Sequence, residues 1–221
     1  LLLYMILKTI FSSFVDFLFP KAPDILKLES LTPSELLSKL TPAKDLGSEI
    51  LAIFNYADPN VRTLVWELKY KKNLRIAQSL AVILSDVIKT EMVDRALFDN
   101  FAHPILIPIP ISNERRLERG YNQTEIICEE IKKLDAENFF DYVQNILAKI
   151  KHTNSQTLIK NKKERVDNVK NSIKAVSPEL VKDRNIILFD DVTTTGATFS
   201  DARRTLMESG AKKILCIAIA H

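Results

Sequence analysis

The 221-residue sequence contains only two cysteines, Cys128 and Cys216, and they lie far apart in the chain. Neither has a second cysteine or a pair of histidines nearby, as zinc ribbons and disulfide-rich scaffolds require. The scarcity of cysteine therefore argues against both classes and favours a reducing compartment, the cytoplasm. Only three histidines occur, and none has the spacing of metal ligands: His103, His152 and His221.

Strong charge, internal repeats and low-complexity tracts are also missing. The net charge of +3 is too small to indicate nucleic-acid binding by itself. No Gly-Lys-Ser or Gly-Lys-Thr occurs, which excludes a Walker-type phosphate loop. The hydrophobic fraction of 46% and the charged fraction of 27% are typical of soluble globular proteins and permit a substantial core.

An apolar segment, LLLYMILKTIFSSFVDFLFP, opens the sequence and is interrupted by Lys8 and Asp16. It has about the length of a membrane span. A secretory signal would carry a positive charge ahead of the apolar run and a small-residue cleavage site after it, and neither is evident. Two interpretations stay open: an amphipathic helix that packs on the domain or a partner, and a segment on or in a membrane surface.

Four prolines separate this segment from the rest of the chain: Pro20, Pro23, Pro33 and Pro42. Proline ends helices and biases the preceding residue toward extended backbone. We therefore interpret residues 20–45 as a linker with one short helix at Thr32–Leu40, where Thr32 is the expected cap. The chain length suits one domain with a small appendage. We predict a helical N-terminal extension at 1–45 and a single domain at 46–221.

Short apolar runs and helix-period patterns alternate through residues 46–221. The apolar runs predict strands at 49–57, 105–109, 185–189 and 213–220. The periodic segments predict helices at 58–70, 76–92, 122–134 and 199–209. Strands that alternate with helices predict an α/β fold with a mostly parallel sheet flanked by helices.

The segment NIILFDDVTTTGATF, residues 185–199, places Asp190 and Asp191 directly after an apolar run. Ligands bind beyond the carboxyl ends of strands in open α/β sheets, and the following helix start offers N–H groups to an anion. Gly196 permits a turn that a side chain would block. We therefore predict a phosphate site in the loop, with the carboxylates free for sugar hydroxyls or a metal ion; the alternative is a capped turn with a surface aspartate pair. The predicted loop residues are Thr193, Thr194, Thr195, Gly196, Ala197 and Thr198.

This segment resembles the phosphoribosyltransferase signature, a hydrophobic strand followed by two acidic residues and a Thr-Thr-Gly-x-Thr loop. The resemblance implies a type I phosphoribosyltransferase fold, in which the loop binds the 5-phosphate of phosphoribosyl pyrophosphate (PRPP). It also implies that the acids contact the ribose hydroxyls and that Mg²⁺ bridges ribose and pyrophosphate. Purine-salvage relatives commonly carry a carboxylate two residues before the loop glycine. This chain has Thr194 there, which disfavours an oxopurine acceptor.

Three further segments, at 54–73, 107–127 and 156–173, resemble the ComF family of phosphoribosyltransferase-like proteins, which are linked to bacterial competence and DNA uptake. The resemblance covers residues 50–221 and implies a competence or helicase protein as partner. The family usually carries a cysteine-rich zinc module after a segment like FVDFLFP. Here the FVDFLFP segment is present and the cysteines are not, so we predict that no zinc is bound.

The arginine-rich segment after the 105–109 run resembles the loop that meets pyrophosphate in this fold. Arginine suits that role because its guanidinium makes charge-assisted bonds to phosphate oxygens. The alternative is a solvated helix start in which neighbouring glutamates balance the arginines, with Tyr121 and Asn122 only packing and capping. The candidate PRPP ligands in this segment are Arg115, Arg116, Arg119 and Gly120.

Residues 149–170 carry seven Lys or Arg and two acids. Their place before the signature strand resembles the mobile hood that closes over PRPP, and Gln156, Arg165 and Asn168 match the family pattern. A solvated basic loop and a single-stranded DNA contact are the alternatives. DNA binding should be weak, because this stretch has no aromatic residue on which bases could stack. The catalytic residues that the resemblance implies are Asp190, Asp191, Arg115 and Arg165.

Other conspicuous residues have ordinary interpretations. We place Lys69 and Tyr70 on the surface near the cleft, Trp66 in the core or an interface, and Cys216 in the core of the last strand. The leading hypothesis is a PRPP-binding phosphoribosyltransferase that uses Mg²⁺ and an unknown acceptor. The rival is a non-catalytic binding module that serves DNA uptake through protein or single-stranded DNA partners.

Overall fold

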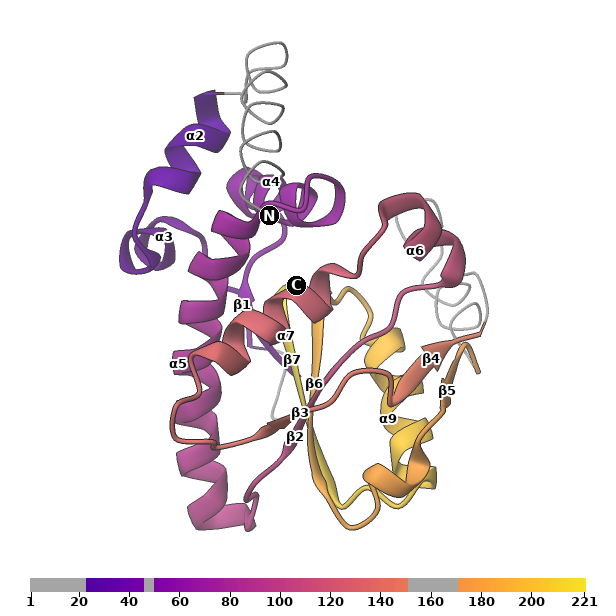
Figure 1. Cartoon of the computed structure of the whole chain (residues 1–221). Coiled ribbons are helices and arrows are strands. Elements are labelled where there is room, and N and C mark those ends of the chain that lie inside the picture. The colour runs from indigo at the N-terminus through magenta and orange to yellow at the C-terminus, as the bar shows by residue number, and fades with distance from the viewer. Residues whose placement is uncertain (1–22, 46–49, 151–170) are drawn as a thin grey trace, which may run out of the picture.

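A computed structural model describes residues 23–45, 50–150 and 171–221 (Figure 1). Its main sheet has five strands in the order β1-β7-β6-β2-β3. Every neighbouring pair is parallel, so the carboxyl ends of the strands meet at one edge. The strands are β1 (Ile50–Phe54), β2 (Ile105–Pro108), β3 (Asp141–Tyr142), β6 (Asn185–Val192) and β7 (Lys213–Ala220).

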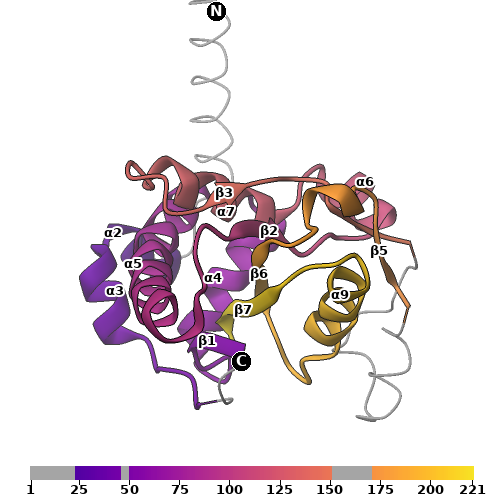
Figure 2. The same cartoon turned by 90° about the horizontal axis from the view of Figure 1, so that it is seen from below.

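Helices cover both faces of this sheet (Figures 1 and 2). Ile187 and Phe189 of β6 join one core cluster, whereas Ile186 and Leu188 join the other, as the alternation of a strand requires. Strands buried on both faces need continuous apolar runs, which explains the sequence of β6 and β7. The predicted α/β class with a mostly parallel, helix-flanked sheet is therefore confirmed. The first cluster is covered by α4 (Pro59–Tyr70), α5 (Leu74–Asp99) and α7 (Gln123–Lys133), and the second by α9 (Ala197–Glu208).

Two short helices, α2 (Pro23–Ser30) and α3 (Pro33–Lys39), precede the sheet and lie beside α5 (Figure 1). Thr32 and Glu35 form a reciprocal capping box at the start of α3, as the Thr-Pro-Ser-Glu sequence favours. Leu28, Leu36 and Leu40 are buried in the α5 cluster. The predicted helix in the linker is confirmed, whereas α2 was missed; the apolar segment at 1–20 lies outside the described residues.

Several elements differ in length from their predicted ranges. Helix α5 is longer than predicted and runs between caps at Asn73 and Asn100, the latter in the left-handed region with φ 51°. Strand β6 continues through the aspartate pair to Val192, because Asp190 and Val192 pair with Ala218 and Ala220 of β7. Trp66 is 48% exposed, which excludes the core as its place and leaves the predicted alternative of an interface, whereas Cys216 is buried in β7 as predicted.

A small antiparallel hairpin, β4 (Leu147–Lys149) with β5 (Ile173–Ala175), lies beyond the main sheet next to α9 (Figure 1). The sequence did not predict it, because a three-residue strand is too short to show an alternating pattern. A short helix, α6 (Asn113–Arg119), follows β2 on the same side, and Ser112 before α6 bridges to Lys149 of β4. The hairpin thus stands next to the loop that leaves the carboxyl end of β2.

Candidate functional site

The aspartate pair lies at the carboxyl edge of the sheet, among the last residues of β6 that pair with β7. Asp190 is partly buried and Asp191 is 4% exposed. The backbone N–H of Asp191 donates to Asp190 Oδ1 over 2.8 Å, and that of Val192 donates to Asp191 Oδ1 over 2.7 Å. The two carboxylates are therefore held by the strand itself and are less exposed than a surface pair would be.

Two side chains from other elements meet Asp191. Lys69 Nζ of α4 lies 3.0 Å from Asp191 Oδ2, and Gln123 Nε2 of α7 donates to the same oxygen over 2.8 Å. The Lys69 side chain is only 23% exposed, so the prediction that Lys69 is an ordinary surface residue is wrong. Arg119 extends the network, since its Nη1 donates to Gln123 Oε1 over 3.2 Å.

The electrostatics of the pair are unequal. Burial, and then the charge of Asp191, raise the pKa of Asp190 to about 8, while Lys69 opposes the shift. Burial alone would lower the pKa of Lys69, but the charge of Asp191 outweighs it and the pKa lies above its ordinary value. Lys69 therefore stays protonated beside the pair. A further cation or hydrogen-bond donor would stabilise the charged form of Asp190.

The predicted phosphate loop turns directly from β6 into α9. The N–H of Thr193 donates to the carbonyl oxygen of Ala220 over 2.9 Å, which ties the start of the loop to the end of β7. Gly196 adopts φ 72°, and a Cβ there would lie 3.2 Å from Ile50 Cδ1. No side chain caps the N-terminus of α9, whereas side chains cap α3, α4, α5, α6 and α7. The N-cap residue Gly196 thus offers no side-chain acceptor, and the N–H of Ala197 donates over a long 3.4 Å to Thr195 Oγ1.

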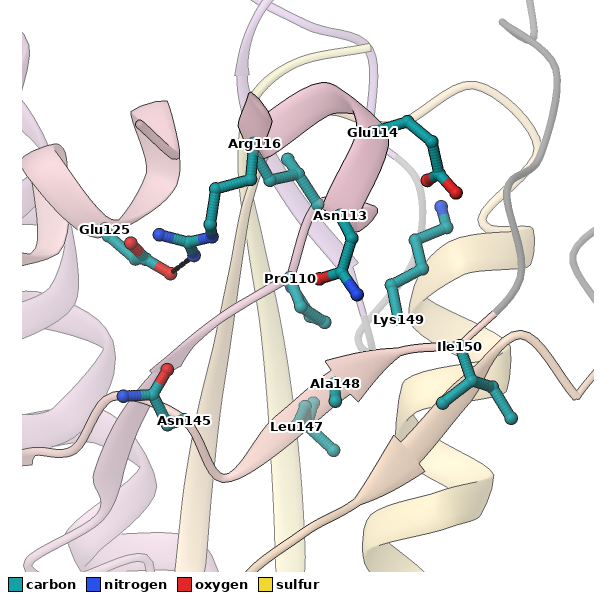
Figure 3. Close-up of a pocket in the computed structure, with 11 residues that line it drawn as sticks. Pro110, Asn113, Glu114, Arg116, Glu125, Asn145, Leu147, Ala148, Lys149 and Ile150 are labelled. Atoms are coloured by element: carbon teal, nitrogen blue, oxygen red, sulfur yellow. Dashed lines mark hydrogen bonds and ion pairs between the residues drawn. The ribbon is translucent and has the colours of Figure 1, made fainter. Parts of the chain in front are cut away.

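The three predicted arginines of α6 have different surroundings. Arg116 forms an ion pair with Glu125 (Figure 3), and Arg119 packs its guanidinium 4.8 Å from the ring centroid of Tyr70. The side chain of Arg115 has no partner within the described part of the chain, and it is partly buried. Gly120 ends α6 with φ 77°. Of the three, Arg115 is thus the one that stays available to a ligand.

The charges of Arg115 and Asp190 both act on Lys149. Burial and the charge of Arg115 lower the pKa of Lys149, and Asp190 and Asp201 oppose that shift. Lys149 also lines a cavity of about 370 Å³ between α6 and β4 (Figure 3). This cavity is bounded by Asn113, Glu114 and Arg116, and neither aspartate of the pair lines it. The cavity lies beside the candidate site and is not its floor.

A third aspartate anchors the hairpin to the helix that follows the loop. Asp201 of α9 accepts from the backbone N–H groups of Asn171, Ser172 and Ile173 over 2.8 to 2.9 Å. Burial would raise the pKa of Asp201, but Arg204 and these amides outweigh it and lower the pKa. The start of β5 is therefore fixed relative to α9 and its N-terminal loop.

The structure places the acid pair and the threonine loop in one strand–loop–helix unit, and the charges of Arg115 and Asp190 both act on Lys149. It does not describe the predicted hood. Arg165, Gln156 and Asn168 lie in residues 151–170, outside the described ranges. Lys69 and Gln123 were missed as site residues. A signal existed for each: Lys69 continues the buried stripe of Val61 and Val65, and Gln123 precedes buried Ile127 by four residues.

The described ranges contain neither a ready-made metal site nor a candidate membrane span. No three Asp, Glu, His or Cys side chains among the described residues come together in a way that could hold a metal ion. None of the helices in those ranges has the length and apolar character that crossing a membrane requires.

Comparison with solved structures finds phosphoribosyl-handling proteins at low similarity. Glutamine PRPP amidotransferase from Bacillus subtilis is 14% identical, with a TM-score of 0.39 over 70% of this chain and 30% of that one. Hypoxanthine phosphoribosyltransferase from Staphylococcus aureus is 8% identical, with a TM-score of 0.34 over 70% of this chain and 62% of that one. At these TM-scores the matches carry no argument about this chain.

Sequence comparison is more informative. No family model matches the chain. Competence protein F of Haemophilus influenzae is 29% identical over 175 residues, 78% of this chain and 72% of that protein. Competence protein ComFC of Bacillus subtilis is 36% identical over 108 residues, 49% of this chain and 40% of that protein, and DNA utilization protein YhgH of Escherichia coli K12 is 23% identical over 166 residues. The chain is thus similar in sequence to two competence proteins and a DNA utilization protein, in the first case over 78% of its length.

Proposed function

We propose that this protein binds Mg-PRPP at the carboxyl end of β6 and acts as a phosphoribosyltransferase. One observation carries the proposal: a carboxylate pair is followed immediately by a threonine-rich turn that opens α9 without a side-chain cap. Uncapped helix N-termini bind phosphate, and neighbouring carboxylates accept from sugar hydroxyls. The order strand, acid pair, loop and helix puts these two kinds of group next to each other.

Each part of PRPP then has a partner of suitable chemistry. The loop from Thr193 to Thr198 would hold the 5-phosphate through backbone N–H groups and hydroxyls. Asp190 would receive the ribose hydroxyls, and Arg115 would face the pyrophosphate. Mg²⁺ fits Asp190, a carboxylate whose raised pKa falls when a cation binds nearby, and it would supply neutralisation of the phosphate charge. Its remaining ligands would be oxygens of PRPP and water.

In the transfer itself the bond between C1 of the ribose and the pyrophosphate oxygen breaks, and a bond from C1 to the acceptor forms. Pyrophosphate leaves with the bonding electron pair, and Arg115 would stabilise that charge. The acid pair would stabilise the ribose as C1 gains positive charge. Thr194 replaces the carboxylate that would serve an oxopurine base, so the proposed acceptor is of another class.

Calorimetric titration of the protein with PRPP in the presence of Mg²⁺ tests the proposal. We expect saturable binding that weakens when Mg²⁺ is chelated and weakens again in Asp190→Asn. Ribose 5-phosphate should compete, because it carries the 5-phosphate and both ribose hydroxyls. Heat of dilution alone, together with an unchanged melting temperature, would remove the proposal.

A second candidate function, single-stranded nucleic-acid binding, is favoured by one surface. Trp66 and Tyr70 are half exposed on α4, with ring centroids 5.7 Å apart. Lys71 Nζ lies 5.5 Å from the Trp66 ring, and Arg119 covers Tyr70. We call this surface the α4 platform: Trp66, Tyr70, Lys71 and Arg119. Aromatic rings interleaved with cations are what single strands bind through stacking and charge.

This platform changes the earlier expectation of weak DNA binding, which considered only the basic stretch at 149–170. The relatives named competence protein and DNA utilization protein also point to DNA, and we extend that role to this chain as a proposal. Trp66 is the only tryptophan, so its fluorescence reports directly on the platform. Oligo-dT should quench it, and about 0.1 M added salt should weaken the effect. Quenching that persists unchanged in Tyr70→Ala with Lys71→Ala would contradict the assignment.

A further inference from the structure

The two aspartates of the acid pair differ in what already surrounds them. Asp191 has three donors: Val192 N–H on one oxygen, and Gln123 Nε2 and Lys69 Nζ on the other. A carboxylate has about four acceptor positions, so little capacity is left. Its side chain is also only 6% exposed. Asp191 therefore has neither the surface nor the acceptor positions that a second ligand-binding carboxylate would need.

Asp190 has the opposite surroundings. Within the described residues, Asp190 accepts from the backbone N–H of Asp191, and the side chain with which it interacts is the carboxyl group of Asp191 and not a cation within salt-bridge distance. It is more exposed than Asp191, and it is close enough to Lys149 for its charge to oppose the lowering of the Lys149 pKa. Asp190 is thus the carboxylate that a ligand can reach.

The donors to Asp191 are themselves fixed by packing. Lys69 stands on the helical stripe that begins with buried Val61 and Val65, so α4 cannot turn it away without losing core contacts. Arg119 donates to Gln123 Oε1, which leaves the amide nitrogen of Gln123 to face Asp191. Both donors reach β6 from helices that are far away in the sequence. An Asp191 without a role in the protein would not require this arrangement.

We propose that Lys69 is a positioning residue of the PRPP site: with Gln123 it holds Asp191 as a buried, neutralised anchor and leaves Asp190 as the carboxylate that meets ribose or magnesium. This division of roles rests on the proposed function. It departs from equal roles for the two acids, because one of them is already occupied by a cation of the protein. Lys69 then neutralises the charge of Asp191, which would otherwise repel the anionic ligand.

A set of variants tests the division through PRPP affinity in the presence of Mg²⁺. Lys69→Met should lower the affinity about tenfold, since an unpaired Asp191 charge repels the phosphates at close range. Lys69→Arg should recover most of the loss. The double variant of Lys69→Met with Asp191→Asn should stay within about threefold of the natural protein, because the pair is then removed as a unit. Asp191→Asn alone should do the same, because the Lys69 charge that it leaves does not repel the phosphates. Asp190→Asn should bind worst.

Arg62→Met is the matched control, since it removes an equal charge from an exposed position of the same helix, outside the acid pair and outside the α4 platform. Urea unfolding of every variant shows which ones are folded, and should reveal that Lys69→Met destabilises the chain while the double variant regains stability. If the double variant binds PRPP as poorly as Asp190→Asn, Asp191 meets the ligand directly and the division is wrong. If Lys69→Met loses stability but not affinity, Lys69 is only structural.

Failure of the proposed function would look different. If the natural protein does not bind PRPP at all, the ligand-facing role of Asp190 falls together with that function. The unfolding measurements would still show whether Lys69 and Asp191 are coupled, because they need no ligand. Loss of stability in Lys69→Met that Asp191→Asn does not relieve would also remove the anchor itself.

Discussion

Asp191 and Asp201 are both buried aspartates within one strand–loop–helix unit, yet their surroundings differ in kind. Asp201 is bound by three backbone N–H groups at and just before the start of β5 and by Arg204 of its own helix, so it fixes one segment of chain to another. Asp191 is bound by side chains from two other helices, one of them a cation, and has a second carboxylate beside it. Burial and a cation partner are thus common to both aspartates, and the neighbouring like charge is what distinguishes the candidate site.

The largest effect should come from Asp201→Ala, which leaves three backbone amides without an acceptor. We expect a loss of about 3 kcal/mol in the free energy of unfolding, roughly 1 kcal/mol for each amide. Urea unfolding measures it, with Glu208→Ala as a control that removes only the exposed partner of Arg204. A loss below that of the control would break the comparison, because Asp201 would then anchor nothing.

The same residue predicts a pH dependence. The pKa of Asp201 is lowered in the folded protein relative to its usual value of 3.8. A depressed pKa contributes stability above the unfolded value, and this contribution is lost as the pH falls through the folded one. The stability gap between the natural protein and Asp201→Ala should therefore be full at neutral pH and shrink below about pH 4.

Gly196→Ala, in the loop between the two aspartates, should have the next largest effect. Alanine at φ 72° is strained, and its Cβ would crowd Ile50. We expect a loss of about 1 to 2 kcal/mol in stability and weaker PRPP binding. Gly120→Ala is the matched control, because its φ of 77° is similar but nothing lies within 4 Å of the added Cβ. Equal effects on PRPP affinity would argue against a phosphate in the Gly196 loop.

The arginines of α6 sharpen the comparison at a smaller scale. Arg115→Gln should weaken PRPP binding about tenfold, since a charge-assisted bond to phosphate is lost. Arg116→Gln should leave binding nearly unchanged, because that side chain is paired with Glu125. Each change should alter stability by less than about 1 kcal/mol, as expected for partly exposed charges. If Arg116→Gln weakens PRPP binding more than Arg115→Gln, then Arg116 and not Arg115 faces the ligand.

The smallest expected effect is none at all: purified protein should carry no stoichiometric zinc. Cys128 and Cys216 are both buried in the core and lie in different elements. Elemental analysis measures the zinc content directly. About one tightly held zinc per chain that disappears in Asp191→Asn would break the comparison, because Asp191 would then be a metal ligand and not an anchor for Lys69.

Local patterns were sufficient to predict four of the five strands of the main sheet and the order in which the acid pair, the glycine loop and the helix follow one another. The apolar run, the acid pair and the glycine loop are adjacent in sequence, so their order alone fixes how β6 leads into α9. Lys69 and Gln123 lie 122 and 68 residues before Asp191, and their meeting depends on how α4 and α7 dock. Helical stripes can place such residues on an inward face, but they cannot select which strand end that face meets.

The hairpin escaped prediction for a different reason. Strands β4 and β5 are three residues each and are stabilised by Asp201 and by each other, more than by their own sequence preference. The polar, weakly periodic character of residues 149–174 therefore gave no sign of the strands β4 and β5 at its two ends. Context decides such short elements, and it becomes visible only when the chain is folded.

Strand order also governs how this chain can fold. Among the named strands of the described residues, β1 pairs with β7 alone, and the register joins Ile50 to Cys216, 166 residues later. Contacts of such long range form slowly, since the entropy of closing the intervening loop must be paid before any pairing helps. On the ribosome, β1 must wait through the synthesis of every other strand with its edge unpaired. Residues 50–54 are thus where a growing chain is most exposed to mispairing, and where a chaperone would have most to protect.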